Sequence, residues 1–366
     1  MLKTIILLLS ALVFSGTVCA SEGVRICVVG PMGGTSASVG MQYKVGVSAA
    51  LNSLPDGRLL GRSVVIDLFD DSCDDSIAEA VAKQIIEEPP AVVIGHSCSG
   101  ATIAGAPIYA SRKVLQISPA STNPKITEMG IKTLFRMIGR DDVQGKLAAQ
   151  RIAEKHAGQR VGVLFFPGTY SQTLSKAAVS ELELRGITPV ALVQAMAGES
   201  SYADEIEKLV SHGVEVLYYV GGGLDSGVFL RQVRQMEATF TVISSDTLVS
   251  RVFQKTAGDA ANGVPFTFPP EAVQLTSATE AVKTIKAMGH DPAGYTLLAY
   301  AATQVWINGV TKAQSFDANK VAEAIRREPV QTILGKVTFN EHGDITTPYP
   351  PFAWYVWKDG RRVPAD

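Results

Sequence analysis

Residues 63–100, SVVIDLFDDSCDDSIAEAVAKQIIEEPPAVVIGHSCSG, contain two short apolar runs separated by a helical pattern. The runs at 63–70 and 91–95 are rich in valine and isoleucine and end at polar residues or glycine, as strands do. Between them, residues 76–88 carry apolar side chains at helical spacing. A strand, a helix and a second strand in this order predict a βαβ unit with two parallel, neighbouring strands.

The same alternation runs along nearly the whole chain. Before the βαβ unit it predicts a strand at 24–30 and a helix at 39–54. After TLFRMIGRDD it starts again, and the expected elements are helices at 143–157, 171–185 and 226–236 and strands at 160–166, 187–193 and 214–223. We therefore expect an α/β fold with two doubly wound parallel-sheet lobes, whose loops at the carboxyl ends of the strands face each other across a cleft.

Two later segments complete this arrangement. Residues 270–309 are mostly helical, with Tyr295, Leu298, Ala302, Val305 and Trp306 on one apolar face, which we interpret as a face of the core and not as a cofactor site. The tail FAWYVWKDG, at 352–360, alternates like a strand and is expected to pack against a lobe.

The amino terminus predicts export. Lys3 precedes the apolar run IILLLSALVF and then SGTVCA, so we expect a signal peptide at 1–20 and a mature chain that starts at Ser21. A membrane anchor is disfavoured because the run is short for a span of about 20 residues. Lipid attachment at Cys19 is disfavoured because Val18 stands where such signals usually carry a small residue. With 33 basic and 35 acidic residues, the chain has no excess of charge that predicts nucleic acid or an anionic membrane as a partner.

The four cysteines divide by context. Cys19 leaves with the signal peptide, and Cys27 lies in an apolar strand, where a cysteine is usually a small buried hydrophobe. Cys73 and Cys98 then remain in an oxidising compartment and are expected to form a disulfide. The five histidines are scattered, so no metal site is predicted. The glycine-rich turn at 28–40 lacks the spacing of a nucleotide-binding motif, and no cofactor is expected.

Two loops carry candidate binding groups. Ser99 starts a helix, where it suits either an anion or the ordinary role of an N-cap. The loop SPAST, at 118–122, offers the Ala120 carbonyl and both the hydroxyl and the N–H of Thr122. This neutral set suits one carboxylate and one ammonium. A secreted hydrolase that uses Ser97 is a remote alternative, because the adjacent His96 should point away from Ser97 on a strand end.

Several motifs occur in the order in which one known family has them: DDSCDD, VVIGHSCSG, QISPASTNPKITEMG, FRMIGRDDVQG, GTYSQ, EVLYYVGGG, AGDAANG and NEHGDI. Nearly the entire chain after residue 20 thus resembles the leucine/isoleucine/valine-binding proteins, the periplasmic receptors of branched-chain amino-acid ABC importers. The resemblance implies a type I periplasmic binding fold, with three crossovers joining the lobes. The expected lobes are 21–140 with 270–349, and 141–269 with 350–366.

The resemblance also implies roles for individual residues. Cys73 and Cys98 match the family disulfide, Ser99 and Thr122 its carboxylate binders, and Ala120 its carbonyl acceptor for the ligand ammonium. Tyr170 matches a tyrosine that closes over the ligand, and Asp246 an acidic residue against the ammonium. Asp246 is one methylene shorter than the glutamate usual there, while Gly222 and Val39 replace bulky aromatic residues, so a larger aliphatic or aromatic amino acid could also fit.

The expected function is that of a non-enzymatic periplasmic solute-binding protein, a monomer that delivers an amino acid to an ABC permease in the inner membrane. There are two alternatives, the first within the same fold and the second from another class of function. One is a receptor for an aromatic or short organic acid that lacks an amine. The other is the ligand-sensing subunit of a signalling complex.

Overall fold

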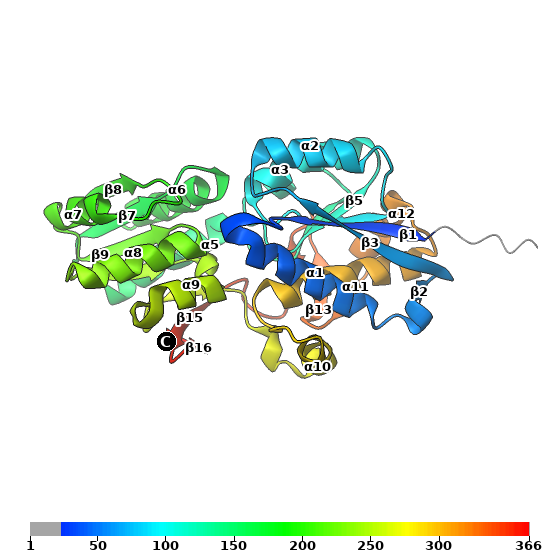
Figure 1. Ribbon diagram of the computed structural model, residues 1–366. Helices are drawn as coiled ribbons and strands as arrows, with labels where there is room; N and C mark the ends of the chain where they lie inside the picture. The colour runs from blue at the N-terminus through cyan, green and yellow to red at the C-terminus, as the bar shows by residue number, and fades with distance from the viewer. Residues whose placement is uncertain (1–22, 366) are drawn as a thin grey trace, which may run out of the picture.

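The computed structural model describes residues 23–365. The expected signal peptide at 1–20, the start of the mature chain at Ser21 and the question of lipid on Cys19 lie outside the described residues. The described chain forms two α/β lobes side by side, which confirms the predicted fold class (Figure 1). None of the helices within residues 23–365 has the length and apolarity needed to cross a membrane.

The first lobe is built on a six-stranded sheet with the order β2-β3-β1-β4-β5-β6. Its strands are β1 (Val24–Gly30), β2 (Arg58–Leu59), β3 (Arg62–Asp70), β4 (Val92–Ile94), β5 (Leu115–Ser118) and β6 (Leu134–Arg136). All neighbouring pairs are parallel except β2 with β3. The inner strands β4 and β5 are buried along their whole length, because helices cover both faces of the sheet.

Helices cover this sheet on both sides (Figure 1). α1 (Ala37–Leu51) packs against α11 (Tyr295–Ala313) on one side, and α2 (Asp75–Ile85) packs against α3 (Ser99–Ser111) on the other. The remaining helices of this lobe are α4 (Lys125–Glu128), α10 (Thr279–Ala287) and α12 (Ala318–Arg327). The predicted apolar face of α11 is confirmed, since Leu298, Ala302, Val305 and Trp306 are all buried. Tyr295 is also buried, but its hydroxyl has another role, described below.

The second lobe contains a seven-stranded sheet with the order β16-β15-β11-β10-β9-β7-β8. Its strands are β7 (Val161–Phe165), β8 (Ala191–Gln194), β9 (Val216–Val220), β10 (Thr241–Ser244), β11 (Phe266–Phe268), β15 (Ala353–Lys358) and β16 (Arg361–Pro364). Its helices are α5 (Asp141–Lys155), α6 (Thr169–Leu184), α7 (Ala203–Ser211), α8 (Gly223–Gln235) and α9 (Arg251–Ala257). The tail does more than pack against the lobe, because β15 pairs antiparallel with β11 and extends the sheet.

A small sheet of β12 (Val330–Thr332), β13 (Gly335–Phe339) and β14 (Ile345–Thr346) completes the first lobe. A buried ion pair fixes it to the main sheet. Arg136, at the end of β6, donates from Nε to Oδ1 of Asp344 over 2.7 Å and from Nη1 to the Asn123 carbonyl over 2.8 Å. Arg136 is fully buried, so these acceptors replace the water that its charge would otherwise require.

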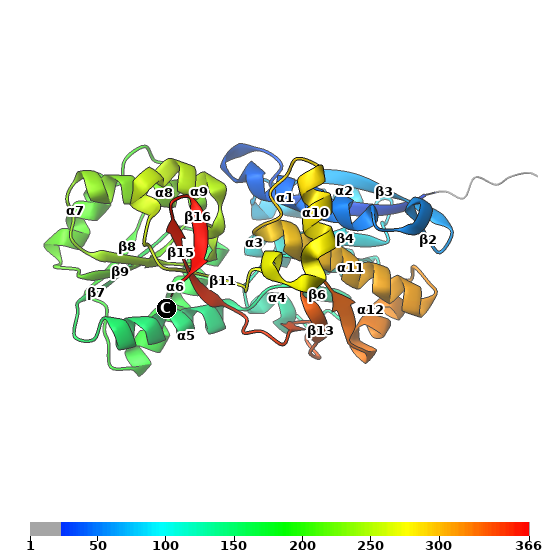
Figure 2. The ribbon, with the colours of Figure 1, turned by 90° about the horizontal axis from the view of Figure 1, so that it is seen from below.

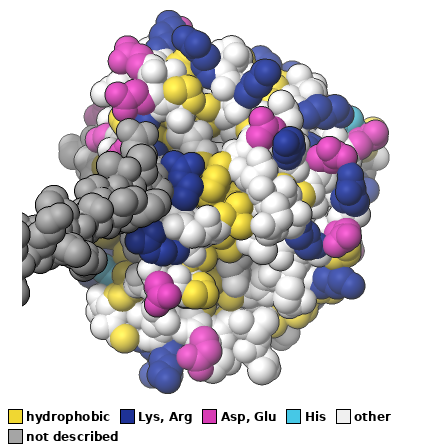
Figure 3. Space-filling view, turned by 90° about the vertical axis from the view of Figure 1, so that its right-hand side faces the viewer, with side chains coloured by type: hydrophobic (Ala, Val, Ile, Leu, Met, Phe, Trp, Pro, Cys, Tyr) yellow, Lys and Arg dark blue, Asp and Glu magenta, His cyan; other side chains and the backbone are white. Residues whose placement is uncertain are grey.

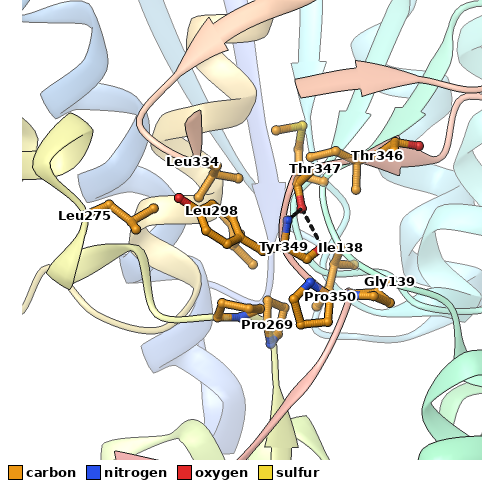
Figure 4. Close-up of a pocket in the computed structure, with 14 residues that line it drawn as sticks. Ile138, Gly139, Pro269, Leu275, Leu298, Leu334, Thr346, Thr347, Tyr349 and Pro350 are labelled. Carbon is orange, nitrogen blue, oxygen red and sulfur yellow. Dashed lines mark hydrogen bonds between the residues drawn. The ribbon is translucent and has the colours of Figure 1, made fainter. Parts of the chain in front are cut away.

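The chain passes between the two main sheets three times: between β6 and α5, between β11 and α10, and between β14 and β15 (Figure 2). All three connections line a hinge cavity of about 320 Å³ (Figure 4), and they contribute Gly139 from the first, Pro269 and Pro270 from the second, and Pro350 and Pro351 from the third. Each proline fixes its own φ and so stiffens the connection. The residue-by-residue division of the lobes at 140/141, 269/270 and 349/350 stays a prediction.

The surface agrees with the balanced composition. On the end of the first lobe that Figure 3 shows, basic and acidic side chains are interspersed. This face therefore presents no extended field of one sign to a polyanion.

Candidate functional site

A cavity of about 420 Å³ lies between the two lobes. It is lined by the loops that follow β1, β3, β4 and β5 in the first lobe and β7, β9 and β10 in the second. These loops meet because the carboxyl ends of parallel strands share one edge of each sheet. All five residues predicted to bind a ligand line this one cavity: Ser99, Ala120, Thr122, Tyr170 and Asp246. Val39 and Gly222, the positions expected to widen the pocket, line it as well.

The first lobe contributes neutral polar groups. Ser99 is the first residue of α3, and Cys98 holds the N-cap position, so Ser99 does not have the capping role that was its simplest interpretation. The Ser99 hydroxyl accepts a hydrogen bond from the N–H of Asn123 over 3.2 Å. Its own proton can still be donated into the cavity. Thr122 and Ala120 are both buried in the loop after β5.

The disulfide between Cys73 and Cys98 is present, with the two Cα atoms 5.4 Å apart, and it confirms the predicted pairing. It joins the loop after β3 to the loop after β4, and both half-cystines line the cavity. Cys27 is free and buried, and burial raises the pKa of its thiol to about 12, so it stays protonated at neutral pH. The loop that presents Ser99 is therefore fixed by a covalent bond at the edge of the cavity.

The His96 side chain is buried in the first lobe, and both of its ring nitrogens are hydrogen-bonded there. It is fully buried, its Nδ1 lies 2.7 Å from Oδ2 of Asp71, and its Nε2 lies 3.0 Å from the hydroxyl of Tyr109. Both ring nitrogens thus have partners inside the first lobe. His96 cannot act as the base for Ser97, and the arrangement gives no support to the hydrolase alternative.

The second lobe contributes one buried carboxylate. Asp246 follows β10 and is only 3% exposed. Its Oδ1 accepts hydrogen bonds from the hydroxyl of Tyr170 over 2.7 Å and from Nε2 of Gln144 over 3.0 Å, and its Oδ2 accepts one from the hydroxyl of Tyr295 over 2.8 Å. Burial, together with the charge of Asp246, holds the pKa values of Tyr170 and Tyr295 well above their ordinary value, so both hydroxyls remain donors.

No basic side chain lines the cavity beside Asp246 within the described part of the chain. All the direct partners of Asp246 in residues 23–365 are neutral donors. A buried carboxylate with neutral donors only is stabilised further by a ligand that brings a positive charge.

Sequence reasoning missed two of these partners. Tyr295 belongs to the apolar face of α11, but a buried tyrosine hydroxyl needs a partner, and this could have marked it. Gln144 lies on the buried face of α5 and also donates to the hydroxyl of Thr267 over 2.7 Å. A glutamine on the inner face of a helix is rarely buried without a hydrogen-bond partner, so its position in the sequence could have marked Gln144 as a polar contact of the site.

A second carboxyl group lies close to Asp246. Asp141 is the first residue of α5, is fully buried, and donates its N–H to the Thr122 carbonyl over 2.9 Å. Burial raises the pKa of the Asp141 carboxyl to about 8; the charge of Asp246 acts in the same direction, while Thr122 and Arg136 oppose it. Asp141 is therefore largely protonated at neutral pH.

Across residues 23–365, no group of acidic, histidine or cysteine side chains has the arrangement of a metal site. The cavity offers the neutral donors and carbonyls around Ser99 and Thr122 on one side and the buried carboxylate of Asp246 on the other. These groups can bind a small zwitterion by hydrogen bonds and charge alone.

Known proteins share this fold and sequence. A family model described as periplasmic binding protein matches residues 23–360. The chain is 32% identical over 355 residues to the Leu/Ile/Val-binding protein homolog 1 of Brucella abortus, covering 96% of this chain and 95% of that protein. The crystal structure of a leucine-binding protein from Thermotoga maritima superposes with a TM-score of 0.85 at 25% identity, covering 94% and 98% of the two chains.

A solute-binding protein of an ABC transporter from R. palustris has been solved in complex with benzoate. It superposes with a TM-score of 0.84 at 17% identity, covering 93% of this chain and 95% of that one, so the two proteins share the fold. The expected resemblance to the leucine/isoleucine/valine-binding proteins is confirmed by the family match and by the Brucella relative. The chain belongs to the periplasmic binding protein family, as a binding protein and not an enzyme.

Proposed function

We propose that this protein captures an α-amino acid between its two lobes in the periplasm and delivers it, as a monomer, to an ABC permease in the inner membrane. The observation that carries the proposal is the position of Asp246: a buried carboxylate with neutral donors only, in the same cavity as Ser99 and Thr122. An α-amino acid brings one charge of each sign, and this cavity offers partners to both.

In this proposal the first lobe binds the carboxylate of the ligand. The Ser99 hydroxyl, the Thr122 hydroxyl and N–H, and the first N–H groups of α3 are neutral donors, and the positive end of the helix dipole favours an anion at that place. The Ala120 carbonyl accepts from the ammonium. Asp246 neutralises the ammonium from the second lobe, and Tyr170 covers the ligand.

Closure of the lobes follows from the energetics of this site. Burial of a zwitterion is costly unless both of its charges are satisfied, and the partners of the two charges lie in different lobes. Only the closed arrangement satisfies both, so the ligand favours that state. The closed shape is then the signal by which the permease distinguishes a loaded protein from an unloaded one.

The experiment is a thermal-shift screen of the chain from residue 21 onward against the amino acids and against amine-free aromatic acids, benzoate among them. A ligand at one hundred times its Kd stabilises the folded state by about 2.7 kcal/mol. We expect a response to amino acids. A response to benzoate-like acids alone would favour the second candidate, a receptor for amine-free acids, which the fold of the benzoate-binding neighbour also supports.

A further inference from the structure

The charged residues that line the cavity all have the same sign. They are Asp75, Asp225 and Asp246, and no lysine or arginine lines it within residues 23–365. Asp75 is exposed and well screened by solvent, whereas Asp225 is half-buried and Asp246 is buried. Closure around a zwitterion with a neutral side chain would place its one ammonium against Asp246 and leave Asp225 without a cation in a region of low dielectric.

The lining also carries many hydroxyl groups. Among the described residues, seven serines and three threonines line the cavity, beside three branched aliphatic residues, Val39, Leu224 and Val252, and three aromatic residues, Phe166, Tyr170 and Tyr295. An aliphatic ligand side chain would remove water from hydroxyl groups without offering them hydrogen bonds, which costs free energy. A polar side chain fits these walls better.

One carboxylate oxygen of Asp225, Oδ1, is used in hydrogen bonds within the second lobe. In the first turn of α8, its Oδ1 accepts hydrogen bonds of 2.7 Å from the N–H of Gly198 and from the hydroxyl of Tyr202. These two bonds fix the orientation of the carboxylate. Its Oδ2 has no protein donor among the described residues and lies beside Gly222.

Gly222 leaves the space in front of this oxygen open. A Cβ atom at residue 222 would lie 3.3 Å from Oδ2 of Asp225. The backbone there has φ −68° and ψ 155°, a conformation that any residue adopts, so the glycine is not required by the turn. The effect of glycine here is that no side chain stands between the cavity and Asp225.

The two second-lobe acids come from neighbouring strands. Asp246 follows β10 and Asp225 follows β9, and Ser244 pairs with Tyr219 at the ends of these strands. The hydroxyl of Thr247 also donates to the Gly221 carbonyl over 2.6 Å and ties the two loops together. One wall of the cavity therefore presents two carboxylates on rigidly connected loops.

We propose that the ligand is an α-amino acid with a cationic side chain, and that Asp225 binds that cation through the opening at Gly222. The inference rests on the proposed function, because it assigns the α-ammonium to Asp246. Asp225 then determines specificity: its Oδ2 forms a charge-assisted hydrogen bond with the side-chain cation, and the serine and threonine hydroxyls solvate the remainder.

The experiment compares L-lysine with L-norleucine, which has the same carbon chain without the terminal ammonium, by calorimetric titration. The unmodified protein should bind lysine at least about tenfold more tightly, as expected for one buried charge-assisted bond. Asp225→Asn keeps the acceptor oxygen for Gly198 and Tyr202 but removes the charge. It should reduce lysine affinity about tenfold or more and change norleucine affinity by less than about threefold.

A second variant leaves Asp225 untouched. Gly222→Leu places a side chain in front of Oδ2 and should also weaken lysine more than norleucine, while Asp204→Asn, which changes an exposed acid of α7 outside the cavity, should alter neither. Equal affinities for the two probes in the unmodified protein, or an unchanged lysine preference in both Asp225→Asn and Gly222→Leu, would overturn the inference and leave the amino-acid function intact. If no amino acid binds at all, the proposed function itself fails.

Discussion

The hydroxyl of Tyr295 lies 2.8 Å from Oδ2 of Asp246 and connects the two lobes across the cavity. Tyr295 begins α11, which packs against α1 in the first lobe, whereas Asp246 follows β10 in the second. The other oxygen of Asp246 is held by Tyr170 and Gln144, both from second-lobe helices. The orientation of this carboxylate therefore depends on both lobes.

Tyr295→Phe should weaken ligand binding without unfolding the protein. The change removes one hydrogen bond to a charged group, which is typically worth about 1.5 to 3 kcal/mol, and keeps the ring in its buried position. Calorimetric titration with the best amino acid from the screen measures the effect. Tyr300→Phe, on the same helix but outside the cavity, is the matched control; an equal loss in both variants would contradict the role given to Tyr295.

Asp246→Ala should weaken ligand binding more than Tyr295→Phe does. If the ligand carries an ammonium, the variant leaves that charge buried without its partner, and truncation of one member of a buried charged pair typically costs about 2 to 5 kcal/mol of binding. Ser99→Ala should cost less, about 1.5 to 3 kcal/mol for one hydrogen bond to a charged group. Titration of both variants tests this order. If Asp246→Ala binds the amino acid as tightly as the parent does, Asp246 does not bind the ligand ammonium.

The strands and helices were predictable because their patterns are local. Runs such as 91–95 and 161–166 are continuously apolar, as expected for strands covered on both faces, and they appear as β4 and β7. The binding loops were predictable for a related reason. Side chains that follow parallel strands must meet at one edge, so Ser99, Thr122 and Asp246 could be grouped before any distance was known.

The partners of Asp246 were not predictable in this way. Tyr295 and Gln144 sit on helices, where the sequence period identifies a buried face but not which polar atom meets which. The bond from Tyr295 to Asp246 joins residues 49 positions apart and depends on how the lobes sit relative to each other. The antiparallel addition of β15 to the second sheet likewise depends on the path of the third connection.

Thiol counting tests the disulfide. In the chain that starts at residue 21, unfolding without reductant should expose one reactive thiol, that of Cys27, and unfolding with reductant should expose three. The bridge closes a loop of sequence separation 25, which the chain-entropy model values at about 3 to 4 kcal/mol. A variant with serine at both positions should lose stability of that order in denaturant unfolding. Three thiols without reductant would contradict the bridge.

Gly139→Ala tests how tightly the hinge is packed. A Cβ atom there would lie 2.5 Å from a ring carbon of Phe352 and 2.9 Å from Cβ of Pro351, on the third connection. Phe352 is buried and cannot move aside freely, so overpacking should cost about 1 to 3 kcal/mol in denaturant unfolding. Gly30→Ala is the control, because its Cβ would meet no atom nearer than 3.6 Å. Equal stability of the two variants would show that the hinge is more open than described.

Asp141 should make the stability of the protein depend on pH. Burial raises the pKa of its carboxyl to about 8 in the folded state, above the ordinary value of 3.8 that it regains on unfolding. Between about pH 4 and pH 8 the folded state therefore holds a proton that the unfolded chain releases. The stabilisation is complete below the lower value and is lost as the pH rises toward the upper one.

Asp141→Asn should remove this dependence, because an amide of the same shape does not titrate. Between pH 5 and pH 8 the free energy of unfolding of the parent should fall by about 3 to 4 kcal/mol more than that of the variant. Denaturant unfolding at the two pH values measures the difference, and every other titrating group cancels between the two proteins. Asp142→Asn changes the exposed neighbour, which pairs with Arg140, and should follow the parent. If the Asp141→Asn profile also runs parallel to that of the parent, Asp141 is ionised in the folded protein, and its carboxyl does not take up a proton on folding.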